Sequence, residues 1–199
     1  MTITNGYCTL SQLKQVLRIT DNVDDVMFSD RISEASRVID DYCNRRFYAD
    51  ATATARVFVA SESSSVLVDD IASTTGLVVK TDTAGDGTYA TILTAADFQC
   101  EPLNAISRGV PITRIATTAS GRFPTTLAPA GVQVTAKWGW PAIPEPIQSA
   151  CVILAGRLVK RGDSLLGVAG FGDLGAITVR SIDPDVQRML APYRVLVVA

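Results

Sequence analysis

The sequence contains no histidine among its 199 residues. Histidine is the commonest general base, the commonest nitrogen ligand of zinc and the base in serine and cysteine nucleophile pairs. No pair of carboxylates stands out from the charged helix faces, so a small enzyme that uses Asp or Glu pairs is the weakest alternative. We expect a protein with no catalytic residues, no cofactor and no metal site.

Cysteine is sparse as well. The four cysteines lie far apart without a Cys-x-x-Cys motif, which favours buried or inert thiols over a metal or redox site; they are Cys8, Cys43, Cys100 and Cys151. The first residues show no secretory signal, and the longest clean apolar stretch, 151–156, is far too short to span a membrane. We therefore expect synthesis in a reducing cytoplasm and no membrane contact.

Basic residues are not clustered. The chain has 18 basic and 20 acidic residues, spread evenly to a net charge of −2. Tight binding to nucleic acid phosphates needs concentrated Lys and Arg. Sequence-specific binding to DNA or RNA is therefore not expected.

Helix signals dominate the start of the chain. Thr9-x-x-Gln12 is a capping box, and it opens a short helix whose apolar face is Leu10, Leu13, Val16 and Leu17. Asp24 and Asp25 suit the start of a second helix that runs to about Tyr48. Its narrow apolar stripe consists of Phe28, Ile32, Ala35, Ile39 and Tyr42. Such a stripe is the seam that one helix offers to another.

From residue 55 to residue 140 the apolar period becomes two, which predicts strands. The candidate strands are Arg56–Ala60, Ser65–Ile71, Gly76–Thr81, Tyr89–Leu93, Pro111–Thr117 and Gly131–Trp140. Asp86-Gly87 predicts a hairpin turn. A calcium loop that uses Asp82 and Asp86 is disfavoured, because the alternating oxygen ligands and the closing glutamate are missing. The block predicts a small β-sandwich or a curled antiparallel sheet.

The sheet-to-helix junction is the clearest local signal. Three prolines, Pro141, Pro144 and Pro146, follow the last strand, and proline ends a strand but suits the first turn of a helix. Trp138 and Trp140 flank this junction as core anchors or, alternatively, as a stacking platform for carbohydrate.

A third helix follows Pro146, with an apolar face of Ile147, Ala150, Cys151, Leu154 and Leu158. Its end carries Lys160 and Arg161, which we interpret as helix capping rather than as a phosphate contact. Asp183-Pro184 then predicts the N-cap and first residue of a last helix, which Pro192 stops.

A glycine-rich loop separates these two helices. It formally contains Gly-x-Gly-x-x-Gly, but a helix precedes it and a strand-like segment follows, the reverse of the order that a dinucleotide site needs. We expect a mobile loop that becomes ordered only against a neighbouring molecule, because fixing glycine costs more entropy than fixing other residues. Its candidate partner-binding residues are Gly167, Val168, Gly170, Phe171, Gly172, Leu174 and Gly175.

The last residues are apolar and β-prone. They either pack as a strand on their own domain or are donated to the sheet edge of a partner, and the sequence leaves both open. The candidate partner-binding residues are Tyr193, Arg194, Val195, Leu196, Val197 and Val198.

Together these patterns predict an α+β fold, in which both chain ends form a small helical bundle around an inserted antiparallel β-sandwich-like domain. The expected domains are residues 1–54 (N-terminal helices), 55–140 (inserted β domain) and 141–199 (C-terminal helices, glycine-rich loop and docking tail).

The order of several motifs resembles the head–tail connector, or adaptor, proteins of long-tailed bacteriophages and gene transfer agents. The motifs are Leu10-x-x-Leu13-Lys14-x-x-Leu17, Ala35-Ser36-x-x-Ile39-Asp40-x-Tyr42-Cys43-x-Arg45-Arg46-Phe47, Gly139-Trp140-Pro141-x-x-Pro144, the glycine-rich loop, Asp183-Pro184-x-Val186 and Leu190-x-Pro192-Tyr193-Arg194. The match covers both helical ends, and the middle resembles the β insertion of larger members.

The resemblance implies a non-enzymatic virion protein at the head–tail interface, assembled in the cytoplasm of a bacterial host. It implies a dodecameric ring that binds the portal protein, extends the channel for genome DNA and recruits a downstream stopper or tail protein. The alternatives are another neck or tail-completion protein, or a carbohydrate-binding β module.

Overall fold

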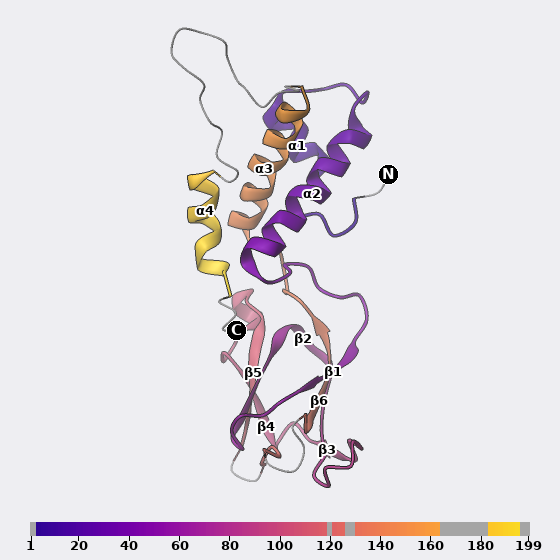
Figure 1. Cartoon of the computed structure of the whole chain (residues 1–199), viewed down its shortest axis with the longest axis vertical. Coiled ribbons are helices and arrows are strands. Elements are labelled where there is room, and N and C mark those ends of the chain that lie inside the picture. The colour runs from indigo at the N-terminus through magenta and orange to yellow at the C-terminus, as the bar shows by residue number, and fades with distance from the viewer. Residues whose placement is uncertain (1–2, 119–120, 126–129, 164–182, 196–199) are drawn as a thin grey trace. The chain divides into compact units, whose positions relative to one another are not determined.

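The computed structural model describes residues 3–118, 121–125, 130–163 and 183–195. The chain divides into two compact units, which are drawn in Figure 1. Residues 1–45 and 143–199 form a helical unit, and residues 46–142 form a sheet unit. The α+β class predicted from the sequence is confirmed.

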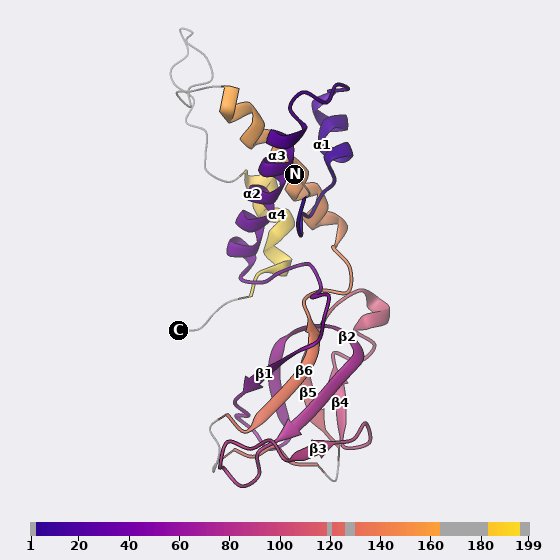
Figure 2. The same cartoon turned by 90° about the vertical axis from the view of Figure 1, so that its right-hand side faces the viewer.

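The helical unit is built around one central helix. Its elements are α1 (Leu10–Leu17), α2 (Asp25–Cys43), α3 (Glu145–Asp163), α4 (Pro184–Leu190) and the short 3-10 helix η2 (Ala191–Tyr193). Helix α3 packs against α1, α2 and α4, so helices from the two ends of the chain share one core (Figures 1 and 2). Buried members of that core include Leu13, Phe28, Ile32, Ile39, Ile147, Val186 and Leu190. None of the described helices is long and apolar enough to cross a membrane.

The helix starts follow the local signals of the sequence. The side chain of Thr9 accepts a hydrogen bond from the backbone N–H of Gln12 at 3.2 Å, and the Gln12 side chain accepts one from the N–H of Thr9 at 2.7 Å. Asp183 caps α4 by accepting from the N–H of Asp185 at 2.9 Å, with Pro184 as the first helical residue. These bonds satisfy donors that a helix start leaves without an intrahelical partner.

Two helix predictions were wrong in detail. Helix α2 ends at Cys43 rather than near Tyr48, because Asn44 adopts the left-handed conformation at φ 52°. Asparagine tolerates that conformation, which ends helices. Val16 was expected on the buried face of α1, but its side chain is 63% exposed.

The sheet unit contains six antiparallel strands in one hydrogen-bonded sheet. They are β1 (Thr54–Phe58), β2 (Ser65–Thr81), β3 (Thr91–Leu93), β4 (Phe98–Glu101), β5 (Ile112–Thr117) and β6 (Val132–Trp138). The strand order is β1-β6-β2-β5-β4, with β3 pairing with β2. The side view in Figure 2 shows β1, β6 and β2 crossing the unit next to one another. The 3-10 helix η1 (Ile106–Arg108) precedes β5.

Strand β2 corrects the prediction of two separate strands. It continues from Ser65 to Thr81, although its register shifts between Leu67 and Ile71 and again between Ile71 and Val78. Its first part pairs with β5, and its second part pairs with β3 and β6. Register irregularities bend a strand and increase its twist, so one strand can serve two sets of neighbours. Strand β4 was not predicted from the sequence.

The core of the sheet unit follows the predicted alternation of β6. Val132, Val134, Ala136 and Trp138 are buried, while the residues between them are partly exposed. They pack with Val66, Ile71, Val79, Ile112, Ile115 and Phe123. The inward-facing positions of one strand therefore supply a large share of this core.

Candidate assembly surfaces

The sheet-to-helix junction is organised by Asp70 of β2. Its backbone carbonyl accepts from the N–H of Gly139 at 2.7 Å, and its carboxylate accepts from Nε1 of Trp140 at 3.0 Å. The Trp140 ring also contacts Phe47, with ring centroids 5.2 Å apart. Strand β6 ends at Trp138 and helix α3 begins at Glu145, as the prolines predict.

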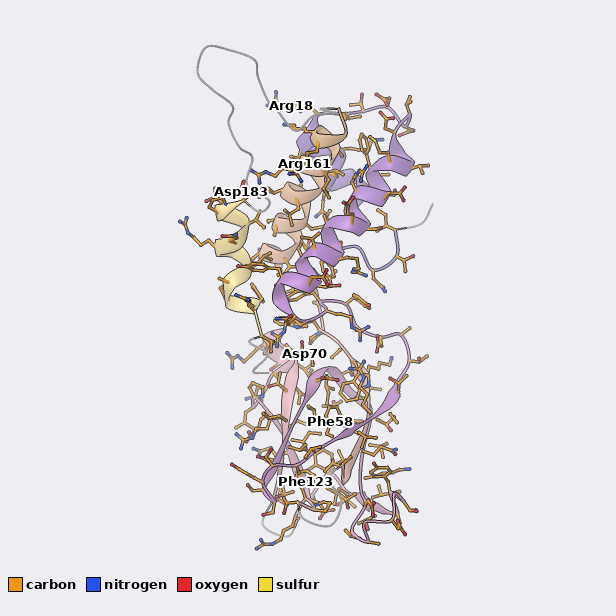
Figure 3. The ribbon with its side chains drawn as sticks, in the orientation of Figure 1. Arg18, Phe58, Asp70, Phe123, Arg161 and Asp183 are labelled. Atoms are coloured by element: carbon orange, nitrogen blue, oxygen red, sulfur yellow. The ribbon has the colours of Figure 1, made fainter. Side chains whose placement is uncertain are left out.

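Both tryptophans are core anchors. Trp138 is fully buried and Trp140 is 5% exposed. Nε1 of Trp138 donates to the carbonyl of Thr54 at 2.9 Å, and its ring lies 5.6 Å from that of Phe58, which is labelled in Figure 3. A stacking platform for carbohydrate needs an exposed aromatic face. The buried tryptophans therefore remove the basis of the carbohydrate-binding alternative.

Asp82 organises the turn between β2 and β3. Its carboxylate accepts the backbone N–H groups of Gly85 at 2.7 Å and Gly87 at 2.8 Å. Burial acts to raise the pKa of Asp82, but hydrogen bonds from the amides of Gly87, Gly85, Asp86 and Ala84 outweigh it and lower the pKa. Both oxygens serve the hairpin turn, in agreement with the hairpin interpretation. Within the described ranges, no three His, Cys, Asp or Glu side chains gather into a group that could hold a metal.

The first residues of the predicted docking tail lie on the helical unit. The backbone N–H of Val195 donates to the carbonyl of Cys43 at 2.9 Å, and its carbonyl accepts from Nδ2 of Asn44 at 3.0 Å. The Arg194 guanidinium lies over the ring of Tyr42, 5.5 Å from its centroid. Tyr193 ends η2 and is partly buried. The candidates Leu196, Val197 and Val198 lie outside the described residues.

The glycine-rich loop also lies outside the described residues, together with all seven of its candidate positions. The helices that flank it are joined by an ion pair between Arg157 of α3 and Asp183, with 2.8 Å between Nη2 and Oδ2. Figure 3 shows Asp183 at the start of α4 and Arg161 on α3. The described residues therefore show one contact between the two helices on either side of the loop.

Three exposed valines lie near one another in the sequence, at the connection between α1 and α2. Val16, Val23 and Val26 are 63%, 85% and 58% exposed. Lys14 stabilises the same connection, because its Nζ donates hydrogen bonds to Oδ1 of Asn22 at 2.7 Å and to Oδ1 of Asp25 at 2.8 Å. The three valines do not contribute to the core of the helical unit, so their apolar surface is available to another molecule.

A thiol cluster was missed by the sequence interpretation. Cys8, in the segment before α1, and Cys151 of α3 are both buried, and an interaction between their thiols raises the pKa of Cys8 and lowers that of Cys151. Ser36 of α2 joins the cluster, with its Oγ 3.4 Å from the Cys151 sulfur. Positions 8 and 151 are too far apart in sequence for any spacing rule to pair them. The other two thiols have raised pKa values: burial raises that of Cys43 to about 11 and also raises that of Cys100.

Comparison with family models finds a match over part of the chain. Residues 7–80 match the family model of the phage gp6-like head-tail connector protein. This stretch contains α1, α2, β1 and nearly all of β2. No curated protein sequence matches the chain.

The fold is shared with chains in solved particles of a gene transfer agent (GTA). One, from the neck of an empty GTA particle computed with C6 symmetry, has a TM-score of 0.57 and 15% identity, covering 100% of this chain and 95% of that chain. Another, from the neck of a native GTA particle computed with C12 symmetry, has a TM-score of 0.58 and 13% identity, covering 100% and 94%. A third, from the virion of a native GTA particle, has a TM-score of 0.54 and 14% identity, covering 100% and 95%.

The match over residues 7–80 and the shared fold confirm the resemblance to the head–tail connector proteins of phages and gene transfer agents.

Proposed function

We propose that the chain is a head–tail adaptor, which assembles as a ring of twelve copies beneath the portal of a phage-like particle. The ring prolongs the channel for genome DNA and recruits the next neck or tail protein. The observation that carries this proposal is the family match over residues 7–80. The C12 and C6 symmetries of the necks that contain similar chains support a ring. The protein assembles in the cytoplasm of a bacterial host and stays in the virion.

The charge of the chain suits a channel wall. Its net charge is −2, without a basic cluster in the sequence. A strongly basic bore would hold the duplex, because each neutralised phosphate releases counterions. A nearly neutral ring lets DNA pass without sequence-specific binding.

The ring contact is assigned to the exposed valines Val16, Val23 and Val26, with a second copy of the chain as occupant. These residues lie within the segment that matches the connector family. Exposed apolar groups that add nothing to their own core gain free energy when a neighbour covers them, about 25 cal/mol per Å².

The portal contact is assigned to residues 193–198. Val195, the residue before the proposed apolar contact, is fixed to the helical unit through Cys43 and Asn44. Burying Leu196, Val197 and Val198 would gain roughly 1.5–3 kcal/mol each, while ordering each residue costs about 1–2 kcal/mol. One tail then binds weakly, and a ring of tails binds firmly through multivalency.

The loop at Gly167–Gly175 is assigned to a neighbouring copy or to the next neck protein. The Arg157–Asp183 ion pair, at 2.8 Å, joins the helices on either side of it. A loop held at both ends pays less entropy when it becomes ordered on a partner than a free segment of equal length does.

The test of the adaptor function is to mix the full chain with the portal protein of the same particle and to image the product by electron microscopy. We expect a ring of this chain on the portal. Absence of binding to the portal contradicts the proposal. Binding only to a completed portal–adaptor assembly would instead indicate a stopper.

A truncation separates the tail assignment from the adaptor function. A chain that ends at Val195 keeps the bonds to Cys43 and Asn44 and loses only residues 196–199. We expect unchanged thermal unfolding and a large loss of portal binding. Normal portal binding by this truncated chain would refute the tail assignment and leave the adaptor function standing.

A further inference from the structure

The thiol cluster joins three segments of the helical unit. Ser36 of α2 accepts the backbone N–H of Tyr7 at 3.0 Å and donates to the carbonyl of Ile32 at 2.7 Å. Its Oγ lies 3.4 Å from the sulfur of Cys151 on α3. Cys8, the residue after Tyr7, is thereby held close to the part of α3 that carries Cys151. The two residues are 5% and 0% exposed, and both are free thiols.

The surroundings of the pair favour one of the two sulfurs as the thiolate. The hydrogen bond from the Cys8 thiol lowers the pKa of Cys151, and the Ser36 hydroxyl and the backbone amides of Tyr7 and Cys8 lower it further against the opposing effect of burial. The same hydrogen bond and burial raise the pKa of Cys8. Cys151 is therefore the sulfur that ionises first, and the thiolate is the reactive form of cysteine.

We propose that Cys8 and Cys151 are a disulfide-forming pair, which under oxidising conditions covalently joins the segment before α1 to helix α3. Ser36 binds the backbone of Tyr7, the neighbour of Cys8, and contacts the sulfur of Cys151, so the two buried cysteines need only a small rearrangement to come within bonding distance. A disulfide cannot persist where glutathione and thioredoxin keep thiols reduced, so the pair stays reduced in the cytoplasm.

The oxidant that we name is a small-molecule disulfide, oxidised glutathione. The Cys151 thiolate attacks one glutathione sulfur, forms a mixed disulfide and expels the other as a thiolate. Cys8 loses its proton and attacks the Cys151 sulfur, and the protein disulfide forms as the second glutathione thiolate leaves. The protein loses two electrons and two protons, and oxidised glutathione becomes two reduced glutathione molecules.

Access controls the rate of this reaction. Because both sulfurs are buried, the oxidant meets them only when the segment before α1 opens locally. Once formed, the bond closes a loop that contains the whole sheet unit, and a long loop restricts the unfolded chain most. The bond should therefore raise the unfolding temperature of the oxidised protein.

The test uses the full wild-type chain, equilibrated with glutathione buffers of increasing oxidised fraction and then blocked with N-ethylmaleimide. Trypsin separates the four cysteines, since they fall in the peptides 1–14, 38–45, 81–108 and 138–157. Mass spectrometry without reductant should find peptide 1–14 joined to peptide 138–157 as the main product. The oxidised chain should unfold about 5–10 °C above the reduced chain.

Cys8→Ser is the matched control, because serine keeps a hydroxyl donor near Cys151 while removing the second sulfur. We expect neither the joined peptides nor the rise in unfolding temperature in this variant. Glutathione adducts on Cys8 or Cys151 without the joined peptides, or links through Cys43 or Cys100, would overturn the proposal. If oxidation is slow in the native protein, a sub-denaturing urea concentration speeds local opening, and failure to form the link there also overturns it. None of these results depends on the ring or the portal.

Discussion

The backbone of Gly139 lies directly against that of Tyr48: a β-carbon on Gly139 would stand 1.8 Å from the carbonyl oxygen of Tyr48. Gly139 also adopts φ +113°, where side-chain-bearing residues are strained. Its N–H is held at 2.7 Å by the carbonyl of Asp70. Glycine is therefore required at the point where strand β6 ends.

Gly139→Ala should destabilise the sheet unit by roughly 3 kcal/mol or more, because backbone strain and a backbone clash add. Urea unfolding monitored by tryptophan fluorescence measures the loss, since Trp138 and Trp140 report on this unit. Gly109→Ala is the control, because Gly109 has φ +70° and nothing within 4 Å of an added β-carbon. It should cost about 1–2 kcal/mol. Equal losses in both variants would show that the close approach to Tyr48 is unimportant.

Asp70→Ala should cost about 1–3 kcal/mol, because it leaves the buried Nε1–H of Trp140 without its carboxylate acceptor. The adjacent Asp69→Ala is the control. Asp69 binds Arg56 at 2.6 Å from an exposed position, and an exposed ion pair contributes about 0–1 kcal/mol. Chemical unfolding should show a larger loss of unfolding free energy for Asp70→Ala than for Asp69→Ala. An Asp69 variant as unstable as the Asp70 variant would contradict the assigned role of Asp70.

Asp82 should make the stability of the sheet unit depend on acid pH. The pKa of its carboxyl is lowered below its ordinary value of 3.8 in the folded protein. A lowered folded pKa contributes stability that is present above the unfolded pKa and is lost as the pH falls through the folded value. We expect this contribution to be complete at neutral pH and to disappear as the pH falls below about 4.

Unfolding of Asp82→Asn between pH 7 and pH 2 provides the measurement. The variant should be less stable than wild type at pH 7, and the difference should shrink as the pH falls, because the wild-type carboxylate becomes protonated. Asp86→Asn is a control in the same turn, since the Asp86 carboxylate accepts the amide N–H of Thr88 at 2.8 Å. A difference between Asp82→Asn and wild type that stays constant over this range would exclude a titrating role for Asp82.

Local chemistry explains which parts of the fold could be predicted. The Thr9–Gln12 box and the Asp183-Pro184 start each depend on a few adjacent residues, and both formed as expected. The alternation of residues 132–138 predicted both a strand and its buried face, because one side of that strand faces the core. Patterns within one element are visible in the sequence since no distant partner is needed to define them.

Errors arose where distant partners decide the structure. Strand β2 continues through the weakly patterned residues 72–75 because β6 supplies pairing, including Ser73 opposite Lys137. Strand β4 has four residues and exists through its pairing with β5. Cys8 and Cys151 come together within the helical unit although the whole sheet unit separates them in the sequence. The tail beyond Val195 and the loop at Gly167–Gly175 stay predictions that depend on partner molecules.

Asp183→Ala should destabilise the helical unit more than Arg157→Ala. Asp183 both caps α4, through the N–H of Asp185, and pairs with Arg157. Loss of a cap costs about 0.5–2 kcal/mol, whereas a partly exposed ion pair contributes about 0.2–1 kcal/mol. A double-mutant cycle measured by thermal unfolding separates the two contributions. A coupling energy equal to the whole effect of Asp183→Ala would mean that the cap contributes nothing.

Val23→Asp combined with Val26→Asp should prevent ring assembly without unfolding the chain. The two side chains are 85% and 58% exposed at the start of α2, so the free protein should change in stability by no more than about 0.5 kcal/mol. In a ring, the new carboxylates would be buried against a neighbour without a partner charge, which strongly disfavours contact. Electron microscopy of mixtures with the portal should show loss of rings.

Val59→Asp, in the sheet unit and 61% exposed, tests whether any added surface charge has this effect. Rings formed by the Val23/Val26 variant, or lost equally in the Val59 variant, would move the ring contact away from the start of α2.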